Sequence, residues 1–291
     1  MAAGRLSQFE RVDVISDRGR ILAGLAPDIT PGEFDDLVRR TVSPEFDSVF
    51  IAAVDGTEIA GIVCFMPHRL SWASDAILTY QAAGVLTSSR YRGRGIFPDI
   101  VKHFEEVIGQ SRSMIFGFPN ENAYPIWTGK LGYQAIKCHK WKLPLGGGIA
   151  PLFLRRRAAS PDAIYQNDRE LIALKRRLYG EALLHAEDGD GYVWGVGRAR
   201  KVKGVELHEF ALGGARFKDG HHFLDLVSRA ASKIGFPKYL SATGVESSPL
   251  GSVFKRGKAS GLEHEVVIFK TFNFDIGDRP LAIYNGVTDW F

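Results

Sequence analysis

Cysteine is scarce in this chain, and its scarcity narrows the chemistry to consider. The 291 residues include two cysteines, Cys64 and Cys138, each inside an apolar, strand-like run. This placement predicts two buried free thiols, because an isolated cysteine behaves as a small hydrophobic residue. The eight histidines show no metal-ligand spacing, and no His-Glu-x-x-His sequence occurs. We therefore expect no disulfide, no cysteine nucleophile and no metal.

Long apolar runs and strong net charge are also missing. No window approaches the roughly 18 consecutive apolar residues of a membrane-spanning helix, and Met1–Arg5 is not followed by a signal-peptide core. The net charge is only +4, and the basic residues cluster locally at 90–94 and 155–157. A broad nucleic-acid-binding face is therefore not expected. These features predict a cytoplasmic protein with no membrane or nucleic-acid partner, and they leave its oligomeric state unknown.

Apolar residues, by contrast, are plentiful. Hydrophobic residues make up 45% of the chain and aromatic residues 11%, which suits packed cores and excludes wholesale disorder. At 291 residues the chain is long for one minimal α/β domain, so we expect two. The pattern breaks at Pro144–Gly148, where a linker begins. The predicted organisation is a first domain at residues 1–145, a linker at 146–161 and a second domain at 162–291.

The most informative segment runs from Val85 to Phe97. An apolar strand-like run enters a loop that reads Arg-Tyr-Arg-Gly-Arg-Gly at 90–95, and an amphipathic helical pattern follows. Glycines let the backbone approach a ligand, the first amides of a helix suit an anion, and arginines donate to phosphate oxygens. The loop is neither the dinucleotide fingerprint nor a P-loop. It predicts a pyrophosphate site of another type.

A second landmark follows this helix. Residues 113–118 predict a strand, a turn containing Asn120 comes next, and residues 130–133 read Lys-Leu-Gly-Tyr. Strand, glycine loop, helix, strand, Asn turn and Leu-Gly-Tyr in this order resemble the GNAT-type N-acetyltransferases, whose loop motif is Gln/Arg-x-x-Gly-x-Gly/Ala. Finer details resemble larger members of bacterial sugar and polysaccharide pathways.

The resemblance implies a fold and an acyl donor. The fold is α/β, with a central mixed, mostly antiparallel sheet flanked by helices, and the donor is acetyl-CoA. By likeness to the family, the end of the central strand at Val85, Leu86 and Thr87 offers backbone groups to the pantetheine arm. Asn120 has two possible roles, a hydrogen bond to the pantetheine amide or an Asx turn with its own backbone. The pyrophosphate contacts implied are Arg90, Arg92, Gly93, Arg94, Gly95 and Ile96.

The second half of the chain echoes the first. Residues 204–212 predict a strand, 221–234 a helix, and 239–245 a strand followed by a polar turn and a short helix. The intervening loop at 213–220 lacks Arg-x-x-Gly-x-Gly. We therefore expect a second, degenerate GNAT-like domain that binds no cofactor, with an unrelated α/β domain as the alternative.

The predicted reaction transfers an acetyl group from acetyl-CoA to the primary amine of a small molecule, with an amino sugar as the first candidate. GNAT enzymes often use a tyrosine on the short helix after the Asn turn to protonate the leaving thiolate. Trp127 stands at that place here, so Tyr124 is the predicted acid and Tyr133 the other neighbouring tyrosine.

The general base is less well defined by the sequence. The central strand at 78–84 carries no acidic residue, which leaves Asp75, Glu121 or a chain of waters. The sequence ends on two aromatics, and a buried α-carboxylate of Phe291 with a raised pKa would also accept an amine proton. Packing alone is the simpler explanation of those aromatics.

Two alternative functions stay open. One is a transferase with another activated donor, either a Fem-like aminoacyl transferase or a long-chain acyl transferase. The other is a non-catalytic CoA-binding regulator, which the missing tyrosine and acidic residue favour. The intact pyrophosphate loop favours CoA over a tRNA donor.

Overall fold

The computed structural model forms two compact units of mixed strands and helices, so the predicted α/β class is confirmed. Unit 1 comprises Met1–Arg69, Ile77–Ala135 and Ile268–Asp275, and unit 2 comprises Leu70–Ala76, Ile136–Val267 and Ile276–Phe291. The described residues are 8–44, 47–72, 75–146, 164–166, 169–245, 248–254, 258–259, 266–277, 279 and 281–283.

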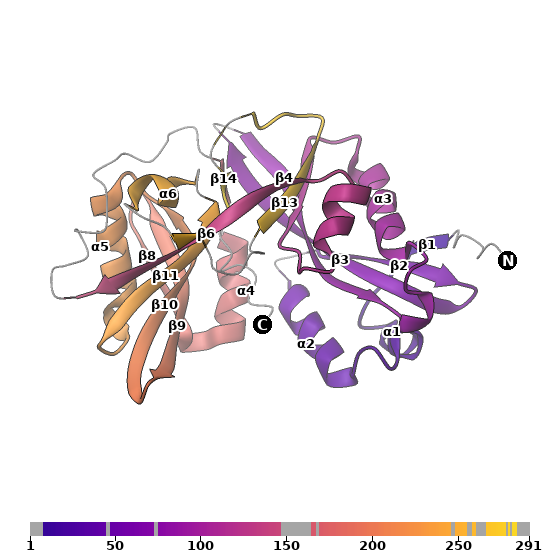
Figure 1. The fold of residues 1–291 in the computed structure, drawn as a ribbon, viewed down its shortest axis with the longest axis horizontal. Helices are drawn as coiled ribbons and strands as arrows, with labels where there is room; N and C mark the ends of the chain where they lie inside the picture. Colours follow the sequence, from indigo (N-terminus) through magenta and orange to yellow (C-terminus); the bar gives the residue numbers. More distant parts are fainter. Residues whose placement is uncertain are drawn as a thin grey trace. The chain divides into compact units, whose positions relative to one another are not determined.

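The sheet of unit 1 has the strand order β1-β2-β3-β4-β5-β13 (Figure 1). Strand β2 is antiparallel to both β1 and β3, whereas β4 and β5 are parallel. The strands are β1 (Gln8–Arg11), β2 (Val49–Asp55), β3 (Glu58–Trp72), β4 (Asp75–Thr87), β5 (Ser113–Gly117) and β13 (Val266–Phe272). The helices are α1 (Arg18–Leu25), α2 (Pro31–Thr41) and α3 (Ile96–Ile108), with short turns η1 (Ser89–Tyr91) and η2 (Ile126–Lys130).

Local sequence explains the placement of the helices of unit 1. Helix α2 starts at a capping box, in which Thr30 and Glu33 each accept a backbone N–H from the other. Helix α3 is amphipathic and buries its apolar side. Its Phe104 ring stacks on Phe65 with centroids 3.8 Å apart and meets the edge of Tyr80 at 4.9 Å. These contacts hold α3 against one face of the sheet.

The last strand of the unit 1 sheet comes from the far end of the sequence. Strand β13 pairs antiparallel with β5, with Ile268 opposite Gly117 and Phe272 opposite Ser113. Lys270 Nζ donates to the Glu105 carboxylate at 2.8 Å and to the Leu131 carbonyl at 3.3 Å. Unit 1 is therefore completed by residues that follow almost all of unit 2 in the sequence.

Unit 2 has the strand order β6-β11-β10-β9-β8. Strands β10 and β11 are parallel, and β6 is antiparallel to β11. The strands are β6 (Gln134–Leu145), β8 (Leu183–Glu187), β9 (Tyr192–Val202), β10 (Val205–Arg216) and β11 (Lys238–Val245), with the short β7 (Ile164–Gln166), β12 (Lys258–Ala259) and β14 (Leu281–Ala282). The helices are α4 (Arg169–Tyr179), α5 (Gly220–Ala230) and α6 (Pro249–Val253), with η4 (Gly180–Ala182) and η5 (Ala231–Lys233).

The two units repeat one topology, β2-β3-β4-β5-β13 in unit 1 and β8-β9-β10-β11-β6 in unit 2. In each, the third and fourth strands are parallel and joined through a long helix, α3 or α5. The fifth strand runs antiparallel to the fourth and comes from the other half of the sequence. The echo seen in the sequence is therefore a repeat of structure.

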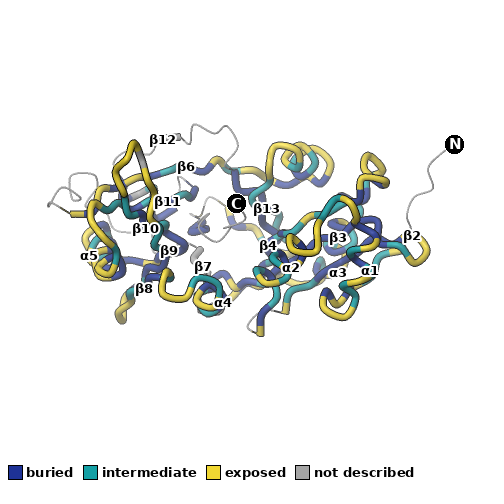
Figure 2. The backbone as a smooth tube through the Cα atoms, turned by 90° about the horizontal axis from the view of Figure 1, so that it is seen from below, coloured by how far each residue is buried: buried dark blue, intermediate teal, exposed yellow. Residues whose placement is uncertain are grey.

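The hydrophobic core of each unit is built from side chains on its strands and on the inner sides of its helices. Figure 2 shows buried residues concentrated in the strands and on the inner sides of helices, with exposed residues at turns and outer helix faces. Phe210 and Leu240 on the sheet of unit 2 and Phe223 on α5 are fully buried in one cluster. Cys64 and Cys138 are buried free thiols, as predicted.

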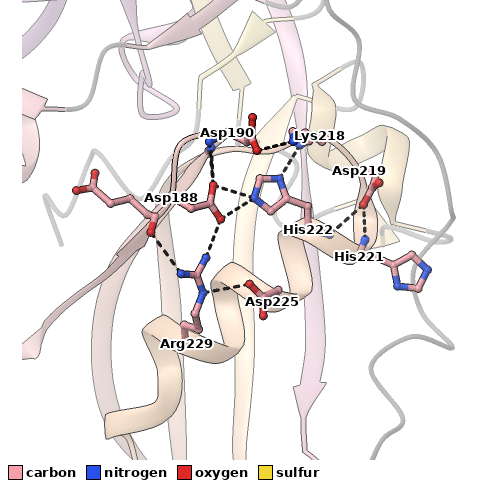
Figure 3. Close-up of polar contacts among 10 residues, drawn as sticks. Asp188, Asp190, Lys218, Asp219, His221, His222, Asp225 and Arg229 are labelled. Atoms are coloured by element: carbon pink, nitrogen blue, oxygen red, sulfur yellow. Dashed lines mark hydrogen bonds and ion pairs between the residues drawn. The ribbon is translucent and has the colours of Figure 1, made fainter.

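A polar cluster fastens the start of α5 to the β8–β9 turn (Figure 3). The His222 ring accepts the Lys218 backbone N–H at Nδ1 (3.1 Å), and its Nε2 lies 3.1 Å from Asp188. Arg229 also bonds Asp188, at 2.8 Å. Since His222 Nδ1 is an acceptor, Nε2–H is the donor to Asp188. These bonds anchor the start of α5 to the β8–β9 turn.

The domain boundaries differ from those expected. The predicted first domain ran from 1 to 145, but strand β6 passes from unit 1 to unit 2 at Ile136, and unit 1 also takes in Ile268–Asp275. A single cut point in the sequence cannot separate the two units, because each unit is built from segments of both halves of the chain. The predicted linker at 146–161 lies, apart from Gly146, outside the described residues.

The exchanged strand gives a prediction about stability. Replacing Lys270 with Met leaves the mostly buried Glu105 carboxylate without its cation, and should cost about 2 kcal/mol of unfolding free energy. Urea denaturation measures this, with Lys102→Met on the exposed side of α3 as the control. In the double variant Glu105→Gln/Lys270→Met the loss should be smaller than the sum of the single losses. Additive losses would contradict the pairing of Lys270 with Glu105.

A second prediction concerns acid stability. The backbone N–H of Asp190 and the His222 side chain lower the pKa of Asp188 from 3.8 to about 2. A lowered carboxyl pKa stabilises the fold above pH about 4, and this contribution disappears as pH falls through about 2. The Asp188→Asn variant should therefore lose less stability than the parent between pH 4 and pH 2 in urea titrations. Equal losses would show that Asp188 does not contribute in this way.

Candidate functional site

The parting of two parallel strands creates the candidate site. Strands β4 and β5 pair from Leu78 and Ser113 as far as Gln81 and Phe116. Beyond that point β4 continues to Thr87 and turns at Gly84, whose φ is +56°. A Cβ atom at Gly84 would lie 2.6 Å from Leu37, so both conformation and space require glycine there. The strands are no longer bonded beyond Gln81, and their free edges face an opening.

A cavity of about 590 Å³ lies in this opening. It is bounded by the end of β4, the loop into α3, the turn after β5 and the connection between α1 and α2. The lining residues are Leu25, Asp28, Ile29, Val85, Leu86, Thr87, Tyr91, Arg92, Gly93, Gly95, Ile96, Phe97, Pro98, Asn120, Asn122, Ala123, Ile126 and Lys130. Eight of the ten predicted cofactor-binding residues are in this set, and Arg90 and Arg94 are not.

The loop into α3 directs backbone donors at the cavity. Gly93 and Gly95 have φ of +78° and +84°, a backbone conformation that favours glycine. Gly95 is the N-cap of α3, and no side chain caps this helix end. The first amides of a helix have no carbonyl partner within the helix, and the helix dipole adds partial positive charge at this end. The start of α3 is therefore suited to an anion.

The three loop arginines have different surroundings. Arg92 Nη2 lies 2.6 Å from the Asp28 carboxylate and lines the cavity. Arg90 pairs with Glu58 and donates to the Gly24 carbonyl at 3.3 Å, so its guanidinium is engaged with the protein. Arg94 lies over the Tyr91 ring, 5.1 Å from its centroid. Among the three, Arg92 is the one that lines the cavity, where it is paired with Asp28.

Asp28 and Tyr91 fix the shape of the loop. The Ser89 backbone N–H donates to Asp28 at 2.6 Å, and this bond, with the Arg92 guanidinium, keeps the pKa of Asp28 below its ordinary value. The Tyr91 hydroxyl donates to Asp55 at 3.1 Å. Burial, together with that carboxylate, raises the pKa of Tyr91. These contacts hold the first half of the loop, at Ser89, Tyr91 and Arg92, against the rest of unit 1.

Asn120 takes one of its two expected roles through its side-chain oxygen. Its Oδ1 accepts the Ala123 backbone N–H at 2.9 Å, which closes an Asx-type turn. The residue also lines the cavity, as do Val85, Leu86 and Thr87 at the end of β4. The turn therefore orients Asn120 at the rim of the site.

The predicted acid residues lie in and beside the turn after β5. Tyr124 is 37% exposed and follows Ala123, but its own side chain is not among those lining the cavity. Trp127 is buried between the rings of Phe97 and Tyr133. Burial, and then the nearby Glu105 carboxylate, raise the pKa of Tyr133 well above its ordinary value. Tyr133 therefore keeps its proton in the core.

The suggested bases receive little support. Glu121 is exposed in the turn after β5, and the side chain of Asp75 is outside the described part of the structure. Phe291 also lies outside the described residues, so its carboxylate is not placed. Within the described residues, no group of three or more potential metal ligands occurs, and no helix there is long and apolar enough to cross a bilayer.

Sequence reasoning missed one wall of the cavity. Leu25, Asp28 and Ile29 belong to the connection between α1 and α2, some sixty residues before the glycine loop. Lys130, at the end of η2, also lines the cavity, although in the sequence it stands out only as part of Lys-Leu-Gly-Tyr. A Pro-Asp-Ile-Thr segment indicates a turn and a helix start, and gives no local sign that its carboxylate reaches a distant arginine.

Comparisons with solved structures identify the fold. A GCN5-related N-acetyltransferase from Kribbella flavida has a TM-score of 0.55 and 15% identity, over 91% of this chain and 71% of that one. A probable N-acyltransferase from Enterococcus faecalis has 0.54 and 10%, over 92% and 73%. Eis1 from Mycobacterium abscessus has 0.54 and 12%, over 90% and 73%.

No family model matches the chain, and no curated protein sequence matches it. The structural likenesses nevertheless extend over nine-tenths of the chain and so include residues of both units. Together with the glycine loop, the parted strands and the Asn turn, they show that this chain has the fold of the GNAT-type N-acetyltransferases.

Proposed function

We propose that unit 1 binds acetyl-CoA and transfers its acetyl group to the primary amine of a small molecule, with an amino sugar as the first candidate. One observation carries the proposal: an uncapped helix start, preceded by two left-handed glycines, opens onto the cavity between β4 and β5. Backbone amides and Arg92 there suit a diphosphate.

The rest of the cavity fits an extended arm attached to that diphosphate. The end of β4 at Val85–Thr87 and the turn at Asn120 line it on two sides. Among the described residues, β4 has no ladder partner on its β5 side beyond Gln81, which leaves its backbone groups for amide groups of a ligand. The apolar members Leu86, Ile96 and Ile126 suit the methylene and methyl groups of pantetheine.

The proposed chemistry is direct transfer. The nitrogen lone pair of a neutral amine attacks the thioester carbonyl carbon, the carbon–sulfur bond breaks, and the amine gives up a proton while the thiolate gains one. The protein must place the amine, stabilise the oxyanion and supply the thiolate proton.

Unit 2 differs at the corresponding helix start, which supports a single cofactor site. Helix α5 is capped by Asp219, whose carboxylate accepts the N–H groups of His221 and His222, each at 2.9 Å. A carboxylate already occupies the position where an anion would sit, and its negative charge opposes a phosphate. Only three residues, 217–219, connect β10 to α5, against eight residues, 88–95, between β4 and α3. We infer that unit 2 binds no CoA.

The first prediction from this proposal uses two glycines with similar backbones. Gly93 and Gly56 have φ of +78° and +62°, and a Cβ atom added at either would have no neighbouring atom within 4 Å. Gly93→Val should weaken acetyl-CoA binding at least about 30-fold, near 2 kcal/mol, because its side chain enters the ligand's space. Gly56→Val imposes similar strain elsewhere and should bind normally. Calorimetry with both proteins decides, and normal binding by Gly93→Val would refute the loop assignment.

The second prediction concerns the acid. We propose that Tyr124 protonates the thiolate, supported by its place between two cavity-lining residues, Ala123 and Ile126. Tyr124→Phe should lower kcat at least about tenfold and alter the alkaline limb of the pH profile, with acetyl-CoA affinity unchanged. Tyr133→Phe, whose ring is in the core, should keep the parent profile. The opposite pattern would move the role to Tyr133.

A protein that binds acetyl-CoA yet releases no thiol with any amine would favour the alternative of a CoA-binding regulator. A protein that binds none of acetyl-CoA, CoA and longer acyl-CoAs would exclude both functions. Preference for a long acyl chain would instead favour a long-chain acyl transferase.

A further inference from the structure

A carboxylate lies in the wall of a cavity that otherwise suits an anion. The charged residues among those that line the cavity are Asp28, Arg92 and Lys130. Cations and backbone amides attract a diphosphate, whereas a carboxylate in the same wall repels it. The presence of Asp28 in this wall therefore requires a reason, and its contacts supply one.

The Asp28 carboxylate is held in place by its own segment and by the loop before α3. Its side chain is only 15% exposed, and its Oδ2 accepts the Ser89 backbone N–H at 2.6 Å. The Asp28 backbone N–H donates to the Leu25 carbonyl at 2.8 Å, and the capping box of α2 begins at Thr30. The carboxylate is thus a fixed point on the cavity wall.

Arg92 is the residue that uses this fixed point. Its side chain is 64% exposed, and a long exposed side chain without a partner moves among many rotamers. Arg92 Nη2 donates to Asp28 Oδ1 at 2.6 Å, which holds the guanidinium at the cavity wall. A guanidinium carries more N–H groups than this one bond takes. The held guanidinium therefore keeps donors for a second anion.

The place of Arg92 in the loop indicates which anion that is. Arg92 directly precedes Gly93, and both residues line the cavity together with Gly95, the N-cap of α3. The guanidinium and the first amides of α3 therefore belong to one stretch of wall, at the helix start that suits an anion. In the function proposed above, the anion at this helix start is the diphosphate of the acyl donor.

We propose, as an extension of that function, that Asp28 is a positioning residue for the donor. It holds Arg92 so that the guanidinium bridges the Asp28 carboxylate and the diphosphate. A side chain that is already ordered loses less conformational freedom when a ligand binds, so the ligand binds more tightly. This gain outweighs the repulsion between Asp28 and the diphosphate, because Arg92 lies between the two anions and is attracted by both.

The variant Asp28→Asn separates the two bonds of the carboxylate. Asparagine has one acceptor oxygen, which can keep the Ser89 N–H, and its N–H₂ group then meets the Arg92 guanidinium donor to donor. The tie to Ser89 is retained, and the hold on Arg92 is lost. The partner variant Arg92→Met keeps an apolar stem and removes every N–H group.

The test is a cycle of Asp28→Asn, Arg92→Met and the double variant. Calorimetry gives the dissociation constants of acetyl-CoA and of dephospho-CoA, which has the diphosphate but no 3′-phosphate. Asp35→Asn is the matched control. It breaks another Asp–Arg pair, Arg18 to Asp35 at 2.8 Å, which joins α1 to α2 and is not among the residues that line the cavity.

For Asp28→Asn we expect dissociation constants about fivefold higher, the effect of freeing one long side chain. The rise should be equal for the two ligands, because they share the diphosphate. Arg92→Met should weaken binding about tenfold, and adding Asp28→Asn to it should cause no further loss, since no guanidinium is left to position. Asp35→Asn should bind both ligands as the parent does.

One further variant tests the bridge without changing Asp28. Arg92→Lys keeps the charge but has no planar fork of donors to share between two anions. It should bind acetyl-CoA more weakly than the parent, about threefold. Parent-like binding by Arg92→Lys would show that charge alone acts at this position, and would overturn the bridge.

Three results with Asp28→Asn would overturn the proposal. Unchanged or tighter binding of acetyl-CoA is the first, and tighter binding would make Asp28 a competitor of the diphosphate. The second is an equal loss in the Arg92→Met background, which would mean that Asp28 acts without Arg92. The third is a loss with acetyl-CoA but not with dephospho-CoA, which would move the contact to the 3′-phosphate.

Failure of this proposal is distinguishable from failure of the proposed function. A parent protein that binds both ligands, with additive losses in the cycle, would remove only the role of Asp28. A parent protein that binds neither ligand would remove acetyl-CoA as the donor, and the role of Asp28 with it.

Discussion

The separation of β4 from β5 is the constraint on which the rest of the site depends. Two parallel strands that remained bonded to their ends would leave no space between them. Here the left-handed Gly84 turns β4 away after Gln81, and Leu37 on α2 fills the space that any side chain at 84 would need. The opening then places the start of α3, the end of β4 and the Asn120 turn around one cavity.

The exchanged strand holds β5 on the edge away from the opening. Strand β13 bonds the other edge of β5, and Lys270 ties it to α3 through Glu105 and to the end of η2 through the Leu131 carbonyl. Thus β5 is held on the side away from the cavity while its cavity side is left partly unbonded. The strand that supports the site is encoded far from it, after most of unit 2.

The repeat of topology places a helix start at the same point of both units, but the two helix starts differ in their caps. Both units place a helix after the third strand, yet Gly95 leaves the first amides of α3 open whereas Asp219 occupies those of α5. A capping carboxylate satisfies the first amides of α5 that a glycine leaves open at α3. The loop before α3 has eight residues and the loop before α5 has three, so the shorter loop also leaves less backbone to surround an anion at α5.

The sequence predicted those parts of the site whose structure is specified by residues that are neighbours in the chain. Gly93, Gly95 and Asn120 lie where the loop and turn motifs put them, because a strand, a tight turn and a helix are each specified by neighbouring residues. The motif could not separate the roles of the arginines, since Arg90 is engaged by Glu58 and Arg92 by Asp28, both distant in sequence. The exchange of β6 and β13 was missed for the same reason: strand pairing depends on residues more than a hundred positions away.

The central claim is that the start of α3 and the parted strands hold the cofactor, and the most direct measurement is a crystal structure grown with CoA. The account predicts diphosphate oxygens within hydrogen-bond distance of the amides at Gly93, Gly95 and Ile96, and a pantetheine arm between Val85–Thr87 and Asn120. It also predicts no CoA at the start of α5. A diphosphate bound at α5, or CoA bound outside the cavity between β4 and β5, would contradict it.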